Sequence, residues 1–139
     1  MIEVVIFDLD GTLADSFEDI ACAANHALVR LDRPPLSIEF IKTKVGHGLR
    51  NLMVGLLDET TDKEIDRTIE LVMEFYEDHP TVHTQLYPGT IEMLDRLMGM
   101  NVQRCVLSNK IDCLVQRIGE NLGLNSRMDE VWGQREGYP

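Results

Sequence analysis

The stretch Asp8-Leu9-Asp10-Gly11-Thr12-Leu13-Ala14-Asp15-Ser16 follows directly on a short apolar segment, residues 3–7. That segment contains Val-Val-Ile-Phe, a continuous apolar run that predicts a strand buried on both faces of a parallel sheet. Gly11 then marks a loop. Because ligands of open α/β sheets bind at the carboxyl ends of the strands, the sequence predicts a site at the start of this stretch.

The spacing of Asp8 and Asp10 has a chemical consequence. Two carboxylates so close together repel each other unless a cation lies between them. Mg²⁺ prefers oxygen ligands and commonly bridges a protein carboxylate to a substrate phosphate. In such a site Asp8 can attack phosphorus, while Asp10 protonates the leaving group and later activates water. For either aspartate alone, a turn carboxylate without a catalytic role is the alternative interpretation.

Residues 16–80 are predicted to form a block of about four helices with no strand among them. Apolar side chains recur at helical spacing through this block. Thr61 and Glu64 form a capping box, and Pro80 ends the last helix.

After this block the pattern alternates between helix and strand. A helix follows Gly89, a strand is predicted at 102–107 and ends before residues 108–110, and a further helix precedes a short strand at 128–132. Such alternation predicts an α/β fold with a parallel sheet and right-handed crossovers. The sheet then carries Asp8 and residues 108–110 at the same edge.

These motifs resemble those of the haloacid dehalogenase superfamily. The stretch 8–13 looks like its first motif, and Asp15-Ser16 extends it to the form of phosphoglycolate-phosphatase-like members with a helical cap. Residues 87–90 and 106–110 resemble the return to the core and the second motif. The resemblance implies a partial Rossmann-like parallel sheet of about three strands with an inserted all-helical cap. Its domains would be a core at 1–15 and 81–139 and a cap at 16–80.

The resemblance also implies an activity. It points to a phosphatase that uses Mg²⁺ to hydrolyse a small phosphorylated metabolite, with 2-phosphoglycolate as the first choice and a phosphosugar phosphatase or phosphomutase as the alternative. Asp8 would be the nucleophile and Asp10 the general acid and base; the Asp8 carboxylate and the Asp10 backbone carbonyl would bind the metal. An acid at position 10 favours a phosphatase or mutase over a dehalogenase. The implied phosphate-binding residues are Gly11, Thr12, Ser108, Asn109 and Lys110.

Within the implied cap, Gly46, His47 and Arg50 are the candidate substrate contacts. A histidine between glycines and close to an arginine suits a substrate carboxylate. The alternative is an ordinary corner between two helices with a surface Arg50.

Two later motifs of the family, a lysine motif and an acidic motif, are not found in these 139 residues. Arg135 is a conceivable substitute for the lysine. We therefore expect the N-terminal portion of a longer phosphatase, with weak Mg²⁺ binding and doubtful activity of its own. The strand at 3–7 would have an open edge that favours pairing with another chain, including a second copy. A catalytically incomplete remnant that acts as a folded or dimerising module is the second hypothesis; a receiver domain of a response regulator would not explain the helical block.

Composition restricts the partners. The chain has 13 basic and 24 acidic residues, a formal net charge of −11, which disfavours nucleic acid and anionic membranes. No apolar run approaches the roughly 18 residues of a membrane span. The N-terminus has no basic segment typical of a secretory signal, and the three cysteines have no disulfide or zinc spacing. These features predict a cytoplasmic protein with reduced cysteines.

Overall fold

The computed structural model describes residues 1–135, and the contacts within it form two compact units. The first unit contains Met1–Ser16 together with the described residues from Thr84 onward. The second unit contains Phe17–His83.

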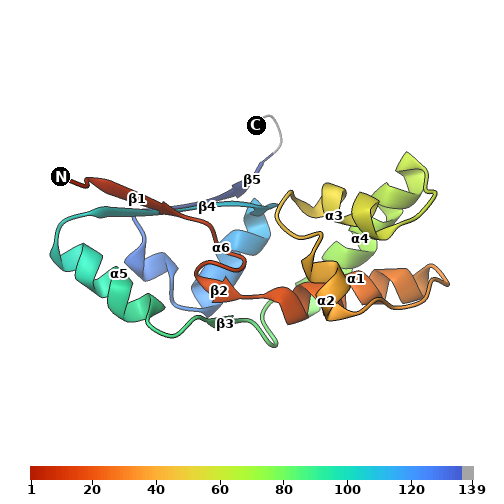
Figure 1. Cartoon of the computed structure of the whole chain (residues 1–139), viewed down its shortest axis with the longest axis horizontal. Helices are drawn as coiled ribbons and strands as arrows, with labels where there is room; N and C mark the ends of the chain where they lie inside the picture. Colours follow the sequence, from red (N-terminus) through yellow and green to blue (C-terminus); the bar gives the residue numbers. More distant parts are fainter. Residues whose placement is uncertain (136–139) are drawn as a thin grey trace. The chain divides into compact units, whose positions relative to one another are not determined.

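The first unit is built on a parallel sheet of three strands in the order β1-β4-β5. Helices α5 and α6 connect these strands and lie on the same side of the sheet (Figure 1). The predicted α/β class is therefore confirmed, although the third strand lies two residues later than the predicted 128–132. The bounds are β1 Val4–Phe7, α5 Thr90–Gly99, β4 Gln103–Ile111, α6 Asp112–Asn121 and β5 Glu130–Gln134, with a 3₁₀ turn at Asn125–Arg127 before β5.

Side chains of β1 alternate between two environments. Val5 and Phe7 are half-buried, whereas Val4 and Ile6 are 45% and 61% exposed. Helices α5 and α6 cover one face of the sheet, and within residues 1–135 no helix of this unit covers the other. The prediction that the apolar run is buried on both faces is thus wrong for this structure. An apolar run shows that both faces suit burial, but a second layer must be present to bury them.

Strand β4 continues to Ile111, past the predicted end at residue 107. The ladder pairs β4 with β5 at Leu107 and again at Ile111, while β5 advances by only two residues. Residues 108–110 therefore stand opposite the single residue Gly133. This bulge displaces three candidate site residues from the regular ladder.

A second, two-stranded sheet joins two distant parts of the first unit. Strand β2 (Ala14–Asp15) pairs antiparallel with β3 (Gln85–Leu86). Next to it, the carbonyl of Leu13 accepts hydrogen bonds from the Tyr87 amide at 3.0 Å and from the Thr90 hydroxyl at 3.3 Å. No sequence pattern predicts this sheet, since strands of two residues show no periodicity.

The second unit consists of four helices, as the sequence predicts. Helix α4 packs against α1 and α3, and α2 packs against α1. Asp19, in the first turn of α1, is buried and accepts hydrogen bonds from the amides of Val82 and His83. Among residues 1–135 no helix combines the length and the apolar character needed to cross a membrane. The bounds are α1 Phe17–Arg30, α2 Ile38–Lys42, α3 Leu49–Leu56 and α4 Asp62–Asp78.

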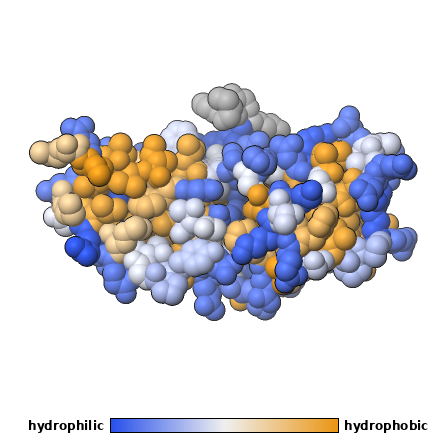
Figure 2. Space-filling view, in the orientation of Figure 1, coloured by the Kyte–Doolittle hydropathy of each residue, from blue (hydrophilic) through white to orange (hydrophobic). Residues whose placement is uncertain are grey.

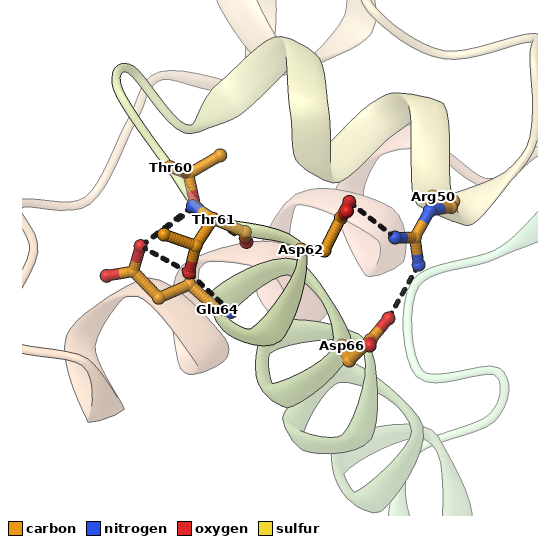
Figure 3. A network of polar contacts seen from close by, with 6 residues as sticks. All are labelled: Arg50, Thr60, Thr61, Asp62, Glu64 and Asp66. Carbon is orange, nitrogen blue, oxygen red and sulfur yellow. Dashed lines mark hydrogen bonds and ion pairs between the residues drawn. The ribbon is translucent and has the colours of Figure 1, made fainter.

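The capping box of α4 is present as predicted (Figure 3). The Thr61 hydroxyl accepts from the Glu64 amide at 3.3 Å, and the Glu64 carboxylate accepts from the Thr61 amide at 3.0 Å. Replacing Thr61 with Ala should lower the free energy of unfolding by about 1 kcal/mol, because an amide of the first turn loses its acceptor. Urea denaturation measures this, with Thr61→Ser as the matched control. Equal losses in both variants would contradict a capping role.

Candidate active site

The turn after β1 places Asp8 at the carboxyl end of the strand, where it is exposed. The Leu9 amide donates to Asp8 Oδ1 at 2.7 Å. The Gly11 amide donates to the Ala14 carbonyl at 2.8 Å, and the Thr12 amide to the Leu9 carbonyl at 3.2 Å. Gly11 has φ of 79°, a conformation that glycine adopts without steric cost. In this structure both amides are used inside the turn, and the contact of Gly11 and Thr12 with a phosphate stays a prediction.

Asp10 is held by two side chains. The Ser16 hydroxyl donates to Asp10 Oδ1 at 2.5 Å. The Lys110 ammonium donates to both carboxylate oxygens of Asp10, at 3.1 Å and 3.3 Å. The side chains of Lys110 and Asp10 are only 9% and 13% exposed, so their attraction is less screened than that of a surface pair. This contact joins the turn after β1 to the bulge of β4, which are a hundred residues apart in sequence.

Ser108 also lies at this edge. Phe7 pairs with Val106, so Asp8 and Ser108 follow at the same end of two neighbouring strands. Ser108 is buried, and its hydroxyl accepts a hydrogen bond from the Lys110 amide at 3.2 Å. Asn109, the next residue of the bulge, is also predicted to bind phosphate, and it is exposed. The structure therefore brings the two candidate motifs to one edge of the sheet.

The candidate substrate residues of the second unit lie at the corner between α2 and α3. Gly46 and His47 are exposed there, and the His47 carbonyl accepts a hydrogen bond from the Asn51 side chain at 2.8 Å. Arg50 lies in the first turn of α3, and its guanidinium points to the first turns of α4 (Figure 3). There it forms ion pairs with Asp62 at 3.0 Å and with Asp66 at 2.6 Å, which sequence reasoning did not foresee.

The oxygen atoms of Asp8 and Asp10 at the carboxyl ends of the strands suit part of a magnesium site. Within residues 1–135 no group of three or more His, Cys, Asp or Glu side chains is arranged to hold a metal ion. Asp8 and the backbone carbonyl of Asp10 offer two oxygen ligands. Mg²⁺ is commonly bound through one or two carboxylates, with waters and substrate phosphates completing the set, so these residues fit a partial site.

Asp112, the first residue of α6, anchors β5 next to the bulge. Its carboxylate accepts from the Gly133 amide at 2.8 Å and pairs with the Arg135 guanidinium at 3.1 Å. Burial alone would raise the pKa of Asp112, but the hydrogen bonds from Gly133 and Arg135 outweigh it and hold that pKa below its ordinary value. Arg135, the conceivable substitute for the later lysine, is thus paired with Asp112 and lies over the ring of Trp132.

The lowered pKa of Asp112 predicts an acid-sensitive contribution to stability. A carboxyl with a lower pKa in the folded state stabilises the fold above its unfolded pKa, and this stability disappears as the pH falls through the folded pKa. Below about pH 4, the thermal stability of Asp112→Asn should therefore fall less steeply with decreasing pH than that of the unsubstituted chain. The pH dependence of the thermal stability of Arg135→Met should be intermediate between those of Asp112→Asn and the unsubstituted chain. Identical pH dependences for all three chains would contradict this role.

Comparisons with known proteins identify the family of this chain. The family model of haloacid dehalogenase-like hydrolases matches residues 5–137. The phosphoglycolate phosphatase of Chromobacterium violaceum is 34% identical over 137 residues, covering 95% of this chain and 62% of that protein. That of Aquifex aeolicus is 32% identical, covering 94% of this chain and 60% of that protein.

Among solved structures, that of a predicted phosphoglycolate phosphatase from Haemophilus somnus superposes with a TM-score of 0.91 at 27% identity. The superposition covers 99% of this chain and 64% of that one. The chain therefore spans less than two thirds of the length of these relatives. It belongs to the family of haloacid dehalogenase-like hydrolases.

Proposed function

We propose that this chain carries the nucleophilic half of a cytoplasmic phosphatase that hydrolyses a small-molecule phosphomonoester through an aspartyl-phosphate on Asp8. The substrate we propose first is 2-phosphoglycolate. Relatives over nearly the whole chain bear the name phosphoglycolate phosphatase, which supports this choice over a phosphosugar. A phosphosugar phosphatase or phosphomutase is the alternative within the family.

The contact between Lys110 and Asp10 is the observation that carries the proposal. It joins a cationic side chain of the second motif to a carboxylate of the first motif, two residues after the exposed Asp8. A chain with a net charge of −11 needs local positive charge to receive a phosphate. We propose that Lys110, at the same edge of the sheet as Asp8, contributes part of this charge.

The proposed reaction has two steps. In the first, a carboxylate oxygen of Asp8 attacks phosphorus, the bond from phosphorus to the ester oxygen breaks, and Asp10 donates a proton to the leaving alkoxide. In the second, Asp10 takes a proton from water, which attacks the same phosphorus and releases inorganic phosphate and the free Asp8 carboxylate. Lys110 and Ser16 hold the Asp10 carboxylate in position. Ser108 and Asn109 would bind the phosphoryl oxygens.

We propose that the Asp8 carboxylate and the Asp10 carbonyl bind Mg²⁺. When bound, Mg²⁺ supplies positive charge that offsets the negative charge of the transferring phosphoryl group. With two ligands from the described residues we expect weak binding of Mg²⁺ by this chain alone.

We further propose that residues 16–80 act as a cap that selects the substrate, with Gly46, His47 and Arg50 as its contacts. The Arg50 ion pairs are compatible with this role. The Arg50 side chain in these ion pairs is about half exposed. Exposed ion pairs contribute about 0–1 kcal/mol to the stability of a fold. Because that contribution is small, Arg50 can exchange Asp62 and Asp66 for a substrate carboxylate.

A panel of small phosphate esters, assayed with and without Mg²⁺, tests the proposal. We expect release of phosphate from 2-phosphoglycolate, loss of this release with a chelator, and a loss of at least about 1,000-fold in Asp8→Asn, since no other group replaces the nucleophile. The assay uses the chain and, where the chain occurs within a longer protein, that protein as well. Turnover that survives Asp8→Asn would contradict the proposed chemistry, and no turnover of any ester would favour a catalytically incomplete remnant.

A further inference from the structure

The chain passes twice between its two compact units. The boundaries fall between Ser16 and Phe17 on the first passage and between His83 and Thr84 on the second. Any change in the orientation of one unit relative to the other requires backbone rotations at these passages, because hinge motions are absorbed by a few connecting residues. The contacts on either side of each passage therefore decide which motions the backbone allows.

On the side of the first unit, backbone pairing joins the two passages. Strand β2 pairs with β3, and the pairing places Asp15 opposite Gln85. The adjoining residues of the two passages, Ser16 and Thr84, are 1% and 7% exposed. The two passages therefore leave the first unit side by side and closely packed.

On the side of the second unit, a single carboxylate joins the two passages. Asp19 lies in the first turn of α1 and is 3% exposed. It accepts a hydrogen bond from the Val82 amide at 3.1 Å, and the His83 amide donates to its two oxygens at 3.0 Å and 3.1 Å. Hydrogen bonds to a carboxylate are stronger than those between neutral groups, and a helix N-terminus stabilises negative charge. These contacts fix residues 82–83 to the start of α1.

A second contact between the passages is weaker. The Glu18 carboxylate lies 3.6 Å from Nδ1 of His83, and these side chains are 57% and 44% exposed. Exposed ion pairs contribute little to stability, and this pair also requires a protonated histidine. Asp19 is therefore the main link between the passages in the second unit.

We propose that Asp19 is a positioning residue that restricts the relative motion of the two units to rotation about one axis. With β3 paired and the His83 amide bound, the second passage can turn only at residues 83–84, and the first only at residues 16–18. Rotation about the line that joins the passages displaces neither passage relative to the other. Rotation about any other axis would pull one passage away from its contacts, so the double connection opposes it.

The effect of Asp19 follows from the length of the connection that it shortens. Helix α4 ends at Asp78, so residues 79–84 connect it to β3. The bonds to Asp19 hold two of these residues against α1. Without them, the rotatable part of the connection would extend back from residue 83 toward the end of α4. For the proposed phosphatase, the restriction would limit the cap to one path of motion, but the inference itself concerns motion and does not depend on the activity.

Distance measurement between two nitroxide labels by pulsed electron paramagnetic resonance tests the proposal. One label is attached to the exposed Cys113 of α6, and the other to a cysteine introduced by Lys63→Cys at an exposed position of α4. Cys22→Ala and Cys105→Ala prevent further labelling. We expect Asp19→Ala to broaden the distribution of distances at least about twofold, since the second passage gains rotatable residues.

The label positions avoid the exposed apolar surface of the sheet. Val4 and Ile6 are 45% and 61% exposed, and apolar atoms gather where Figure 1 draws β1 (Figure 2). A nitroxide label near that surface would adhere to it and distort the distances. Both labels lie on helices, and α6 covers the opposite face of the sheet.

Two variants serve as controls. Asp19→Asn retains one acceptor oxygen, so its distribution should be intermediate in width between those of Asp19→Ala and the labelled chain with Asp19. Thr68→Val removes another buried hydrogen bond of the same unit, which the Thr68 hydroxyl, 0% exposed, donates to the Glu64 carbonyl at 2.7 Å. This variant should leave the width unchanged, because Thr68 lies within α4 and not at a passage.

Two further measurements separate a lost contact from a lost fold. The amides of Val82 and His83 should exchange with solvent at least about tenfold faster in Asp19→Ala, because they lose their acceptor. A second pair of labels, at Lys63→Cys and Arg30→Cys with Cys113→Ser, lies entirely within the second unit. Its distribution should be the same in every variant, since α1 and α4 still pack together.

The outcomes decide the inference. An unchanged width in Asp19→Ala, together with faster exchange at Val82 and His83, would overturn it, because the contact would be lost without an effect on the motion. Equal broadening in Thr68→Val would also overturn it. If Asp19→Ala alters the distances within the second unit, Asp19→Asn decides: broadening supports the inference, and an unchanged width contradicts it. Failure to hydrolyse any phosphate ester would contradict the proposed function alone.

Discussion

Gly133→Ala should lower the free energy of unfolding by about 3 kcal/mol or more, at the upper end of what overpacking usually causes. A Cβ at this position would lie 2.5 Å from Asp112 Cα, 2.6 Å from the Lys110 carbonyl oxygen and 2.8 Å from the Asp112 amide nitrogen. All three neighbours are backbone atoms, so no side-chain rotation relieves the contact. The same residue stands opposite the bulge that carries Ser108–Lys110, and its replacement should therefore displace the candidate site as well.

Gly99→Ala is the matched control for this prediction. Gly99 ends α5, has no neighbour within 4 Å of an added Cβ, and does not have a positive φ. Alanine there should leave the stability unchanged or raise it by up to about 1 kcal/mol. Denaturant unfolding of both variants gives the comparison. A Gly133→Ala chain as stable as Gly99→Ala would show that β5 does not approach the bulge as closely as described.

Lys110→Met should destabilise the chain by about 2–4 kcal/mol at neutral pH. The substitution leaves the carboxylate of Asp10, 13% exposed, without its cation, and breaking a buried pair from one side is typically costly. Replacing both Lys110 and Asp10 should destabilise the chain by less than the sum of the two single substitutions, because the double variant has no unpaired charge. A double-mutant cycle with Asp10→Asn measures this coupling, which we expect to exceed about 1.5 kcal/mol.

Arg67→Met is the control for the ion pair. Arg67 pairs with Glu70 at 2.8 Å, but these side chains are 53% and 65% exposed. Exposed pairs of this kind contribute about 0–1 kcal/mol. If Lys110→Met were as mild as Arg67→Met, or if the cycle showed no coupling, the contact between Lys110 and Asp10 would not be the link between the two motifs that we describe.

The sequence predicts the architecture well because its signals are local. Helical spacing, the capping box at Thr61 and the apolar segments before Asp8 and before Ser108 each depend on a few neighbouring residues. Their order alone implies a parallel sheet with a helical insertion. The residues of the candidate site can also be predicted from the sequence, because each of the two motifs is a continuous stretch.

Other features depend on distant residues and could not be predicted. The bulge opposite Gly133 results from the register between β4 and β5, and no pattern within either strand reveals it. The ion pairs of Arg50 with α4 arise from the packing of helices whose contacts no periodicity specifies. The exposure of Ile6 likewise reflects the absence of a covering layer in the described residues, not a property of the strand itself.

Detection of a phosphoryl group on Asp8 tests the central claim most directly. The chain, or a longer protein that contains it, is quenched in acid during turnover of 2-phosphoglycolate and examined by peptide mass spectrometry. We predict a covalent phosphoryl group on the peptide that contains Asp8, absent when Asp8→Asn is used. Phosphorylation of another residue, or undiminished turnover in Asp8→Asn, would contradict the account.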